Sequence, residues 1–117
     1  MESESLELAK KFLGKKVKVV CDRPLGTKHP KHGFVYEVNY GYIPDTKAPD
    51  GEELDAYVVG VYEACTEFEG VCVAIIHREN DDDDKIVVVP ESASPSDEEI
   101  INAVSFQEKW FVSKLIR

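Results

Sequence analysis

Apolar residues near the start of the chain recur at helical spacing. Leu6, Ala9 and Leu13 lie three to four positions apart, and Gly14 follows them directly. This spacing predicts a short amphipathic helix over 4–13 that ends at the glycine.

The middle of the chain carries apolar stretches of the kind found in strands, divided by loops and turns. Polar and apolar positions alternate over 16–22, and the later stretches are rich in aromatic and β-branched residues. We expect strands over 16–22, 34–42, 54–62, 71–77 and 86–89. A turn near Glu69-Gly70 is expected to separate the third strand from the fourth.

A second helix is predicted near the end of the chain. The segment 94–99 offers Ser and Asp as caps and an acidic first turn, and the apolar stripe that follows continues toward Lys114. About five short strands with two helices indicate a mainly β, α+β protein. We expect one domain over 1–117, a small five-stranded barrel of OB type with a C-terminal helix and a short N-terminal helix.

Composition and charge exclude several classes of protein. The 117 residues are 43% hydrophobic and carry a formal net charge of −9, which argues against a nucleic-acid partner. No apolar run approaches the length of a membrane span. The acidic first residues do not look like a signal peptide, so we expect a cytoplasmic location. The three cysteines have neither disulfide-framework nor zinc-site spacing.

The segment Asp50-Gly51-Glu52-Glu53-Leu54-Asp55 concentrates carboxylates. In an extended chain Asp50 and Glu52 point to one side, and Asp55 joins them if the chain bends at Gly51. Two carboxylates at ~4 Å repel by about 4 kcal/mol at an effective dielectric of about 20, so the cluster must bind protons, separate into water or hold cations. Oxygen ligands suit Mg²⁺, Mn²⁺ or Ca²⁺. The alternative is a solvated acidic turn.

Two further segments carry candidate chemistry. The aspartate run 81–84 leads into Lys85 and a Val-rich strand, and a lysine beside metal-binding carboxylates is suited to a phosphate oxygen. The aromatic segment has Tyr36, Tyr40 and Tyr42 at even spacing, so the three could line one strand face. The alternatives are a solvated loop and ordinary barrel packing.

Together these segments resemble the soluble inorganic pyrophosphatases. That family has an Asn-Tyr-Gly-Tyr-Ile element, here 39–43, then an Asp-x-Asp-x-x-Asp motif, here 50–55. An aspartate-rich turn and a lysine that opens a Val-rich strand ending in Pro follow, here 81–90. The resemblance covers roughly Val17 to Phe111. It implies an OB-type barrel, Mg²⁺ (with Mn²⁺ as a second option), hydrolysis of pyrophosphate to two phosphates, no membrane partner, and a homo-oligomer as in many members.

The resemblance also assigns roles to individual residues. The metal ligands that it implies are Asp50, Asp55 and Asp83, with Asp22 at the place of a site glutamate that precedes Pro. The catalytic residues are Glu52, which would activate the bridging water, and the site tyrosine Tyr40. The substrate-binding residues are Lys85, Lys28, Lys31 and Tyr36.

The sequence departs from the family pattern at three places. Glu52 replaces an aspartate, and catalytic groups must usually sit within ~0.5 Å of productive geometry. Trp110-Phe111 stands where the family has a Tyr-Lys pair that grips phosphate. The family also has a longer N-terminal region with a lysine and an arginine for phosphate, for which Lys28 and Lys31 are the only nearby candidates here. The basic loop offers His29 and His32 as replacements for the lost cationic grip. The alternative functions are a binding module for phosphate or a nucleotide, without hydrolysis, and a related phosphoanhydride hydrolase.

Overall fold

The apolar stretches form the strands of one sheet. The computed structural model describes residues 4–46, 51, 53–79 and 84–117, and every structural statement below concerns those residues. The elements are α1 (Glu4–Lys10), β1 (Lys16–Arg23), β2 (Asn39–Ile43), β3 (Leu54–Val58), β4 (Glu67–Arg78), β5 (Lys85–Val89), α2 (Asp97–Glu108) and β6 (Ser113–Ile116).

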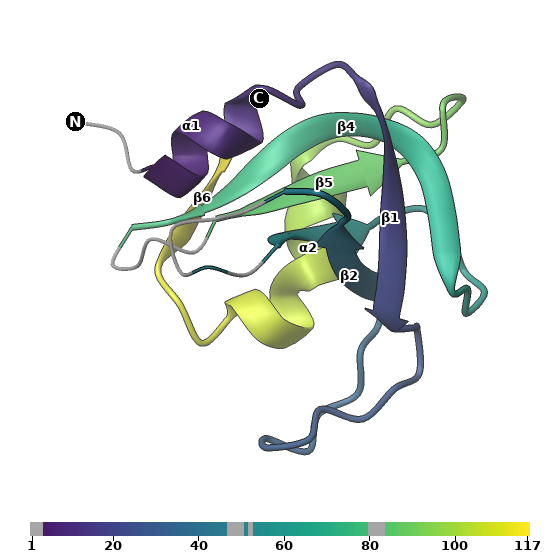
Figure 1. Cartoon of the computed structure of the whole chain (residues 1–117). Coiled ribbons are helices and arrows are strands. Elements are labelled where there is room, and N and C mark those ends of the chain that lie inside the picture. The colour runs from purple at the N-terminus through teal and green to yellow at the C-terminus, as the bar shows by residue number, and fades with distance from the viewer. Residues whose placement is uncertain (1–3, 47–50, 52, 80–83) are drawn as a thin grey trace.

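The sheet closes on itself into a barrel. Its strand order is β1-β2-β3-β5-β4, and an antiparallel pairing of β1 with β4 joins the two ends. The β3–β5 pair is parallel and the other pairs are antiparallel. Figure 1 shows β4 as a long curved strand that wraps around the others. The predicted five-stranded OB-type barrel with two helices is confirmed.

Both faces of the central strands are buried, which explains the unbroken apolar run in β5. Ile86 and Val88 pack with α1 residues in one core, whereas Val87 and Val89 pack in a second core. The second core is covered by the apolar side of α2, which contributes residues such as Ile100. The strand period of two therefore divides β5 between two cores.

The N-terminus of α2 is the one that the sequence predicts, but its end is not. Ser96 and Glu99 form a reciprocal capping box. The helix ends at Glu108 instead of running toward Lys114. The chain then turns and forms β6, which pairs with the outer part of β4 through Ile76↔Leu115 and its neighbours. Pairing with a sheet edge outweighs the local helical pattern, so this expectation was wrong.

The expected turn at Glu69-Gly70 was also wrong, because both residues lie inside β4. Gly70 is needed there because the backbone of β4 approaches the backbone of β5 closely at this position. A Cβ at this position would lie 2.3 Å from the Val89 backbone oxygen, closer than any real contact. The glycine therefore allows the bent strand to lie against β5. The strand expected over 54–62 is shorter than predicted and ends at Val58.

Candidate functional site

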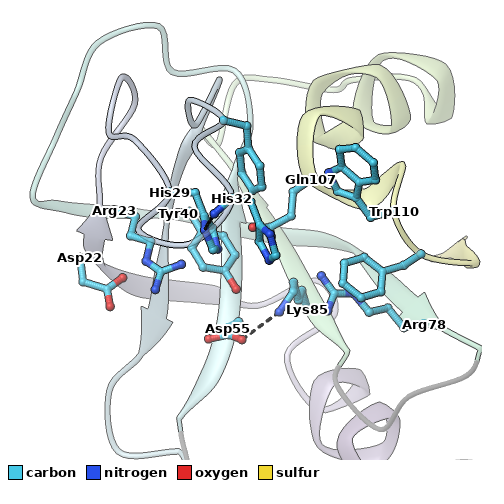
Figure 2. A pocket seen from close by; sticks show the side chains of 12 residues that line it. Asp22, Arg23, His29, His32, Tyr40, Asp55, Arg78, Lys85, Gln107 and Trp110 are labelled. Atoms are coloured by element: carbon cyan, nitrogen blue, oxygen red, sulfur yellow. Dashed lines mark hydrogen bonds and ion pairs between the residues drawn. The ribbon is translucent and has the colours of Figure 1, made fainter.

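One cavity of about 710 Å³ opens where several strand ends meet the loop after β1 and the end of α2. Figure 2 shows its side chains. It is lined by Asp22, Arg23, His29, His32, Phe34, Tyr40, Asp55, Arg78, Lys85, Gln107, Trp110 and Phe111. Its volume lies within the range of roughly 300–1,000 Å³ that is usual for small-molecule sites.

An ion pair crosses one side of the cavity. Asp55 and Lys85 are register partners on the parallel strands β3 and β5. The Lys85 ammonium donates to Asp55 Oδ2 at 2.9 Å, and it lies 5.4 Å from the centre of the Tyr40 ring. The lysine side chain is only 3% exposed, whereas Asp55 is 33% exposed. The buried lysine is therefore fixed in place, and the carboxylate reaches the open space.

A second carboxylate, Asp22, lies at the end of β1. Partial desolvation raises the pKa of Asp22 above its ordinary value of 3.8, and repulsion from Asp55 and Glu53 raises it further. Its own backbone hydrogen bond and Arg23 act in the opposite direction. The negative charges of Asp22 and Asp55 thus repel each other, and a cation bound between the two carboxylates would relieve this repulsion.

Arg23 is held in the cavity by a buried tyrosine. The Arg23 guanidinium donates to Tyr36 Oη at 2.6 Å, and the same hydroxyl donates to Gln107 Oε1 at 3.1 Å. Tyr36 is fully buried and does not line the cavity itself. The hydrogen bond from Arg23 to Tyr36 is also the first cause that raises the pKa of the guanidinium above its ordinary value. Arg23 is therefore positioned as a permanent cation.

The same chain of hydrogen bonds continues to a second arginine. Gln107 Nε2 donates to Tyr57 Oη at 2.6 Å, and that hydroxyl donates to Glu108 Oε2 at 2.6 Å. Glu108 accepts two bonds from Arg78, at 3.1 Å from Nε and 2.8 Å from Nη2. The Arg78 guanidinium lies 3.7 Å from the centre of the Phe111 ring. A continuous polar chain thus joins the two arginines of the cavity.

The loop after β1 presents two histidines. The backbone N–H groups of Lys31 and His32 both donate to His29 Nδ1 at 3.1 Å. An Nδ1 that accepts bonds carries no proton, so the neutral ring bears its proton on Nε2. Desolvation, Arg23, His32 and Lys31 all lower the pKa of His29 below 6.5. His29 is therefore a neutral N–H donor at the cavity.

The Asn-Tyr-Gly-Tyr-Ile element has one site residue and two structural ones. Tyr40 lines the cavity. Asn39 Oδ1 accepts from the backbone of Leu25 and Cys65 and so ties two loops to β2. A Cβ on Gly41 would lie 1.8 Å from the Val20 backbone oxygen, so a side chain there would separate β1 from β2.

The structure brings together four of the predicted site residues and not the others that it describes. Asp22, Tyr40, Asp55 and Lys85 line the one cavity, as do the two histidines. Lys28 and Lys31 lie within the described part of the chain and do not line it. Asp50, Glu52 and Asp83 lie outside the described residues.

Sequence reasoning missed three polar groups of the site, and two of them left a signal. Arg23 is the strand partner of Tyr40, and it follows Asp22 at the end of β1. Arg78 ends the apolar stretch of β4, where a charged residue is unexpected. Gln107 lies on the apolar stripe of α2, and only the tertiary structure reveals its bonds to two tyrosines.

The described residues do not by themselves complete a metal site. Among them no group of three His, Cys, Asp or Glu side chains is arranged to hold an ion. Asp84, the described member of the aspartate run, is buried and bonds to His77 Nδ1 at 2.7 Å and the Arg78 N–H at 3.1 Å. Its carboxylate therefore bonds to the end of β4 and does not line the cavity.

Comparison with known proteins assigns the family. The sequence model described as inorganic pyrophosphatase matches residues 5–114. The chain belongs to the inorganic pyrophosphatase family. The expected resemblance is thereby confirmed. An inorganic pyrophosphatase of Saccharolobus solfataricus is 35% identical over 87 residues, which make up 71% of this chain and 51% of that protein. The chain therefore spans about half the length of this relative of the same family.

Solved structures of the family share the fold. An inorganic pyrophosphatase from Ehrlichia chaffeensis gives a TM-score of 0.66 at 16% identity, over 87% of this chain and 85% of that one. The Helicobacter pylori protein gives 0.63 at 17% identity, over 86% and 81%. The Neisseria gonorrhoeae protein gives 0.62 at 22% identity, over 80% and 72%. No helix among the described residues is long and apolar enough to cross a membrane.

Proposed function

We propose that this protein hydrolyses inorganic pyrophosphate to two phosphates in a reaction that depends on Mg²⁺ or Mn²⁺. The observation that carries the proposal is one cavity that places the carboxylates of Asp22 and Asp55 beside the cations Arg23 and Lys85, in a chain of this family. Carboxylates suit divalent metal and cations suit phosphate oxygens, and phosphoryl transfer requires both.

The donor set fits a hard divalent cation. Asp22 and Asp55 offer oxygen ligands. Burial is the first cause of the raised pKa of Asp22 and the charge of Asp55 adds to it, and a bound cation would offset both by favouring the ionised carboxylates. We propose both as ligands, with Asp50 and Asp83 completing the set as the resemblance implies. When bound, such ions neutralise phosphate charge and lower the pKa of a coordinated water.

The remaining groups of the cavity would bind and orient the substrate. Arg23 presents a planar guanidinium that matches phosphate oxygens, and Lys85 supplies a point charge. Neutral His29 can donate its Nε2–H to a phosphate oxygen. Tyr40 lies beside Lys85 and can order a water or a phosphate oxygen. Glu52 is proposed as the base that accepts the proton of the attacking water.

Three broader expectations complete the proposal. We propose a single domain over 1–117, a cytoplasmic location and assembly into a homo-oligomer. We also propose that the protein has neither a nucleic-acid partner nor a membrane partner. The first is supported by the family match over 5–114 and the second and third by composition and family resemblance. Roles of Lys28, Lys31 and Tyr36 in direct substrate binding have no support from the cavity lining.

The direct test is release of phosphate from pyrophosphate by the purified protein, first with Mg²⁺ and then with Mn²⁺. We expect turnover that chelation abolishes and that Asp55→Asn lowers by at least tenfold. Asp97→Asn is a matched control, because Asp97 lies on the surface in an ion pair with Arg117. Phosphate release no faster than with the metal ions alone would overturn hydrolysis and leave a binding module.

A further inference from the structure

The cavity has more apolar lining than its proposed substrate can use. Pyrophosphate consists of phosphorus and oxygen alone, so it gains nothing from aromatic rings. Yet the lining includes Phe34, Trp110 and Phe111 in addition to the charged groups. Small-molecule sites that hold organic ligands combine an apolar wall with a few polar anchors in this way.

Trp110 and Asp22 mark opposite ends of the cavity in Figure 2, and Asp55 lies between them, paired with Lys85. In Figure 2 the Trp110 indole lies beside the end of α2, far from the Asp22 carboxylate at the end of β1. Arg23, Tyr40 and Lys85 lie between these two ends in the view. A ligand that spans the cavity would therefore be anionic at one end and apolar at the other.

The Trp110 side chain is accessible to a ligand in the cavity. It is 66% exposed even though it lines the cavity, and Phe111 beside it is 43% exposed. The adjacent exposed rings of Trp110 and Phe111 together offer apolar surface that a ligand in the cavity can contact. The Lys109 ammonium lies 5.1 Å from the indole ring and adds a positive charge at this end.

The aromatic rings of the loop after β1 form the neighbouring wall. His29 lies 4.8 Å from His32 and 4.7 Å from Phe34, measured between ring centres. The His32 and Phe34 rings are parallel to within 5°. These three rings pack against one another and together give the cavity one aromatic wall.

We propose that the cavity binds an organic phosphoanhydride with an aromatic base, a nucleoside diphosphate or triphosphate. The base would stack on Trp110, and the diphosphate would contact Arg23 and Lys85. The inference rests on the proposed function for its phosphate end and goes beyond it for the base. Stacking accepts any base because every base has a π face, so the structure assigns the ligand class and not one nucleotide.

The test compares two inert ligands that differ only by a nucleoside. Methylenediphosphonate imitates pyrophosphate, and adenosine 5′-(α,β-methylene)diphosphate adds adenosine to the same group. Adenosine alone is the third ligand. Trp110 is the single tryptophan of the chain, so quenching of its fluorescence reports directly on stacking. Calorimetric titration of the full chain with Mg²⁺ gives the dissociation constants of parent and variants.

We expect the nucleotide analogue to quench Trp110 and to bind more tightly than methylenediphosphonate. Trp110→Ala should weaken the nucleotide analogue by about five- to 150-fold, the range for loss of one base stack, and leave methylenediphosphonate unchanged. Trp110→Phe should restore most of the loss. Tyr62→Ala is the matched control, because Tyr62 is 88% exposed and does not line this cavity.

Each outcome decides between the two proposals. Equal binding of both phosphonates, unaffected by Trp110→Ala, would overturn the inference and leave pyrophosphate hydrolysis standing. Adenosine that binds as tightly as its diphosphate analogue would also overturn it, since the phosphate end would then contribute nothing. Failure of both phosphonates to bind would overturn the inference and the proposed function together. Melting temperatures of the variants verify that each remains folded.

Discussion

At the scale of single residues, the site depends on buried polar groups that satisfy one another. The hydroxyls of Tyr36 and Tyr57 each accept one hydrogen bond and donate another, so they link Arg23 to Gln107 and Gln107 to Glu108. No buried side-chain nitrogen or oxygen of the described residues lacks a partner. Such networks rigidify a site when they are complete and are costly when one member is removed.

Glu108→Gln tests this network. The change removes the charge that pairs with Arg78, whose side chain is only 6% exposed. Breaking a buried ion pair by removing one partner is strongly destabilising, so we expect a loss of about 3 kcal/mol in the free energy of unfolding, measured by urea denaturation. Glu98→Gln is the control, because it makes the same change at an exposed position of α2. Similar small losses in both variants would contradict the role of the pair.

The lowered pKa of His29 predicts that the free energy of unfolding depends on pH. Its pKa in the folded protein lies below 6.5, first because of desolvation and then because of Arg23, His32 and Lys31. The unfolded chain therefore takes up this proton first as the pH falls, and stability is full above 6.5 and declines below it. His29→Asn keeps an acceptor for the loop N–H groups and removes the titration. The slope of unfolding free energy between pH 7 and about 5 should be shallower in the variant, and an unchanged slope would contradict this assignment.

At the scale of elements, the outcome shows what the sequence could and could not predict. The helix start within 94–99, with its Ser cap and acidic first turn, and the apolar run of β5 are local signals, and both predictions agree with the structure. The predicted end of α2 and the predicted turn at Gly70 were wrong. The pairing of β6 and the course of β4 depend on partners that are distant in sequence. The same distinction applies to the site. Asp55 and Lys85 lie in recognisable motifs, whereas Gln107 and Arg78 become site residues only through tertiary contacts.

Gly41→Ala tests an element contact that the sequence motif conceals. Its new Cβ would lie 1.8 Å from the Val20 backbone oxygen, so β1 and β2 would have to separate. We expect a loss of about 1–3 kcal/mol or more in the free energy of unfolding, as for overpacked cores. Gly26→Ala is the comparison, because that glycine has a φ of 92° but open space around it. Gly41 itself has no positive φ, so a loss in Gly41→Ala no larger than that in Gly26→Ala would show that the barrel accommodates the added methyl group and that close approach does not require the glycine.

At the scale of the whole molecule, barrel closure brings distant segments into one site. Asp22 at the end of β1 and Asp55 in β3 are separated along the sheet by β2, which contributes Tyr40 to the same cavity. Lys85 joins them because β5 runs parallel to β3. The two carboxylates repel in a protein without metal, and this repulsion is a cost that the folded barrel carries and the unfolded chain does not.

A divalent cation should therefore stabilise the folded molecule, and the shift should depend on Asp55. An ion that binds only the folded state at about 100 times its dissociation constant adds about 2.7 kcal/mol, or roughly 10 °C in melting temperature for a domain of this size. Asp55→Asn removes one ligand oxygen and also the partner of Lys85, so its melting temperature without metal will itself differ. The informative quantity is the increase on adding Mg²⁺ or Mn²⁺ to each protein, measured by calorimetry. That increase should largely vanish in Asp55→Asn and persist in Asp97→Asn, whose carboxylate pairs with Arg117 on the surface. A chelator should reverse the increase in melting temperature. An increase that is equal in all three proteins would show that the ions bind elsewhere, and the metal site proposed at Asp22 and Asp55 would be wrong.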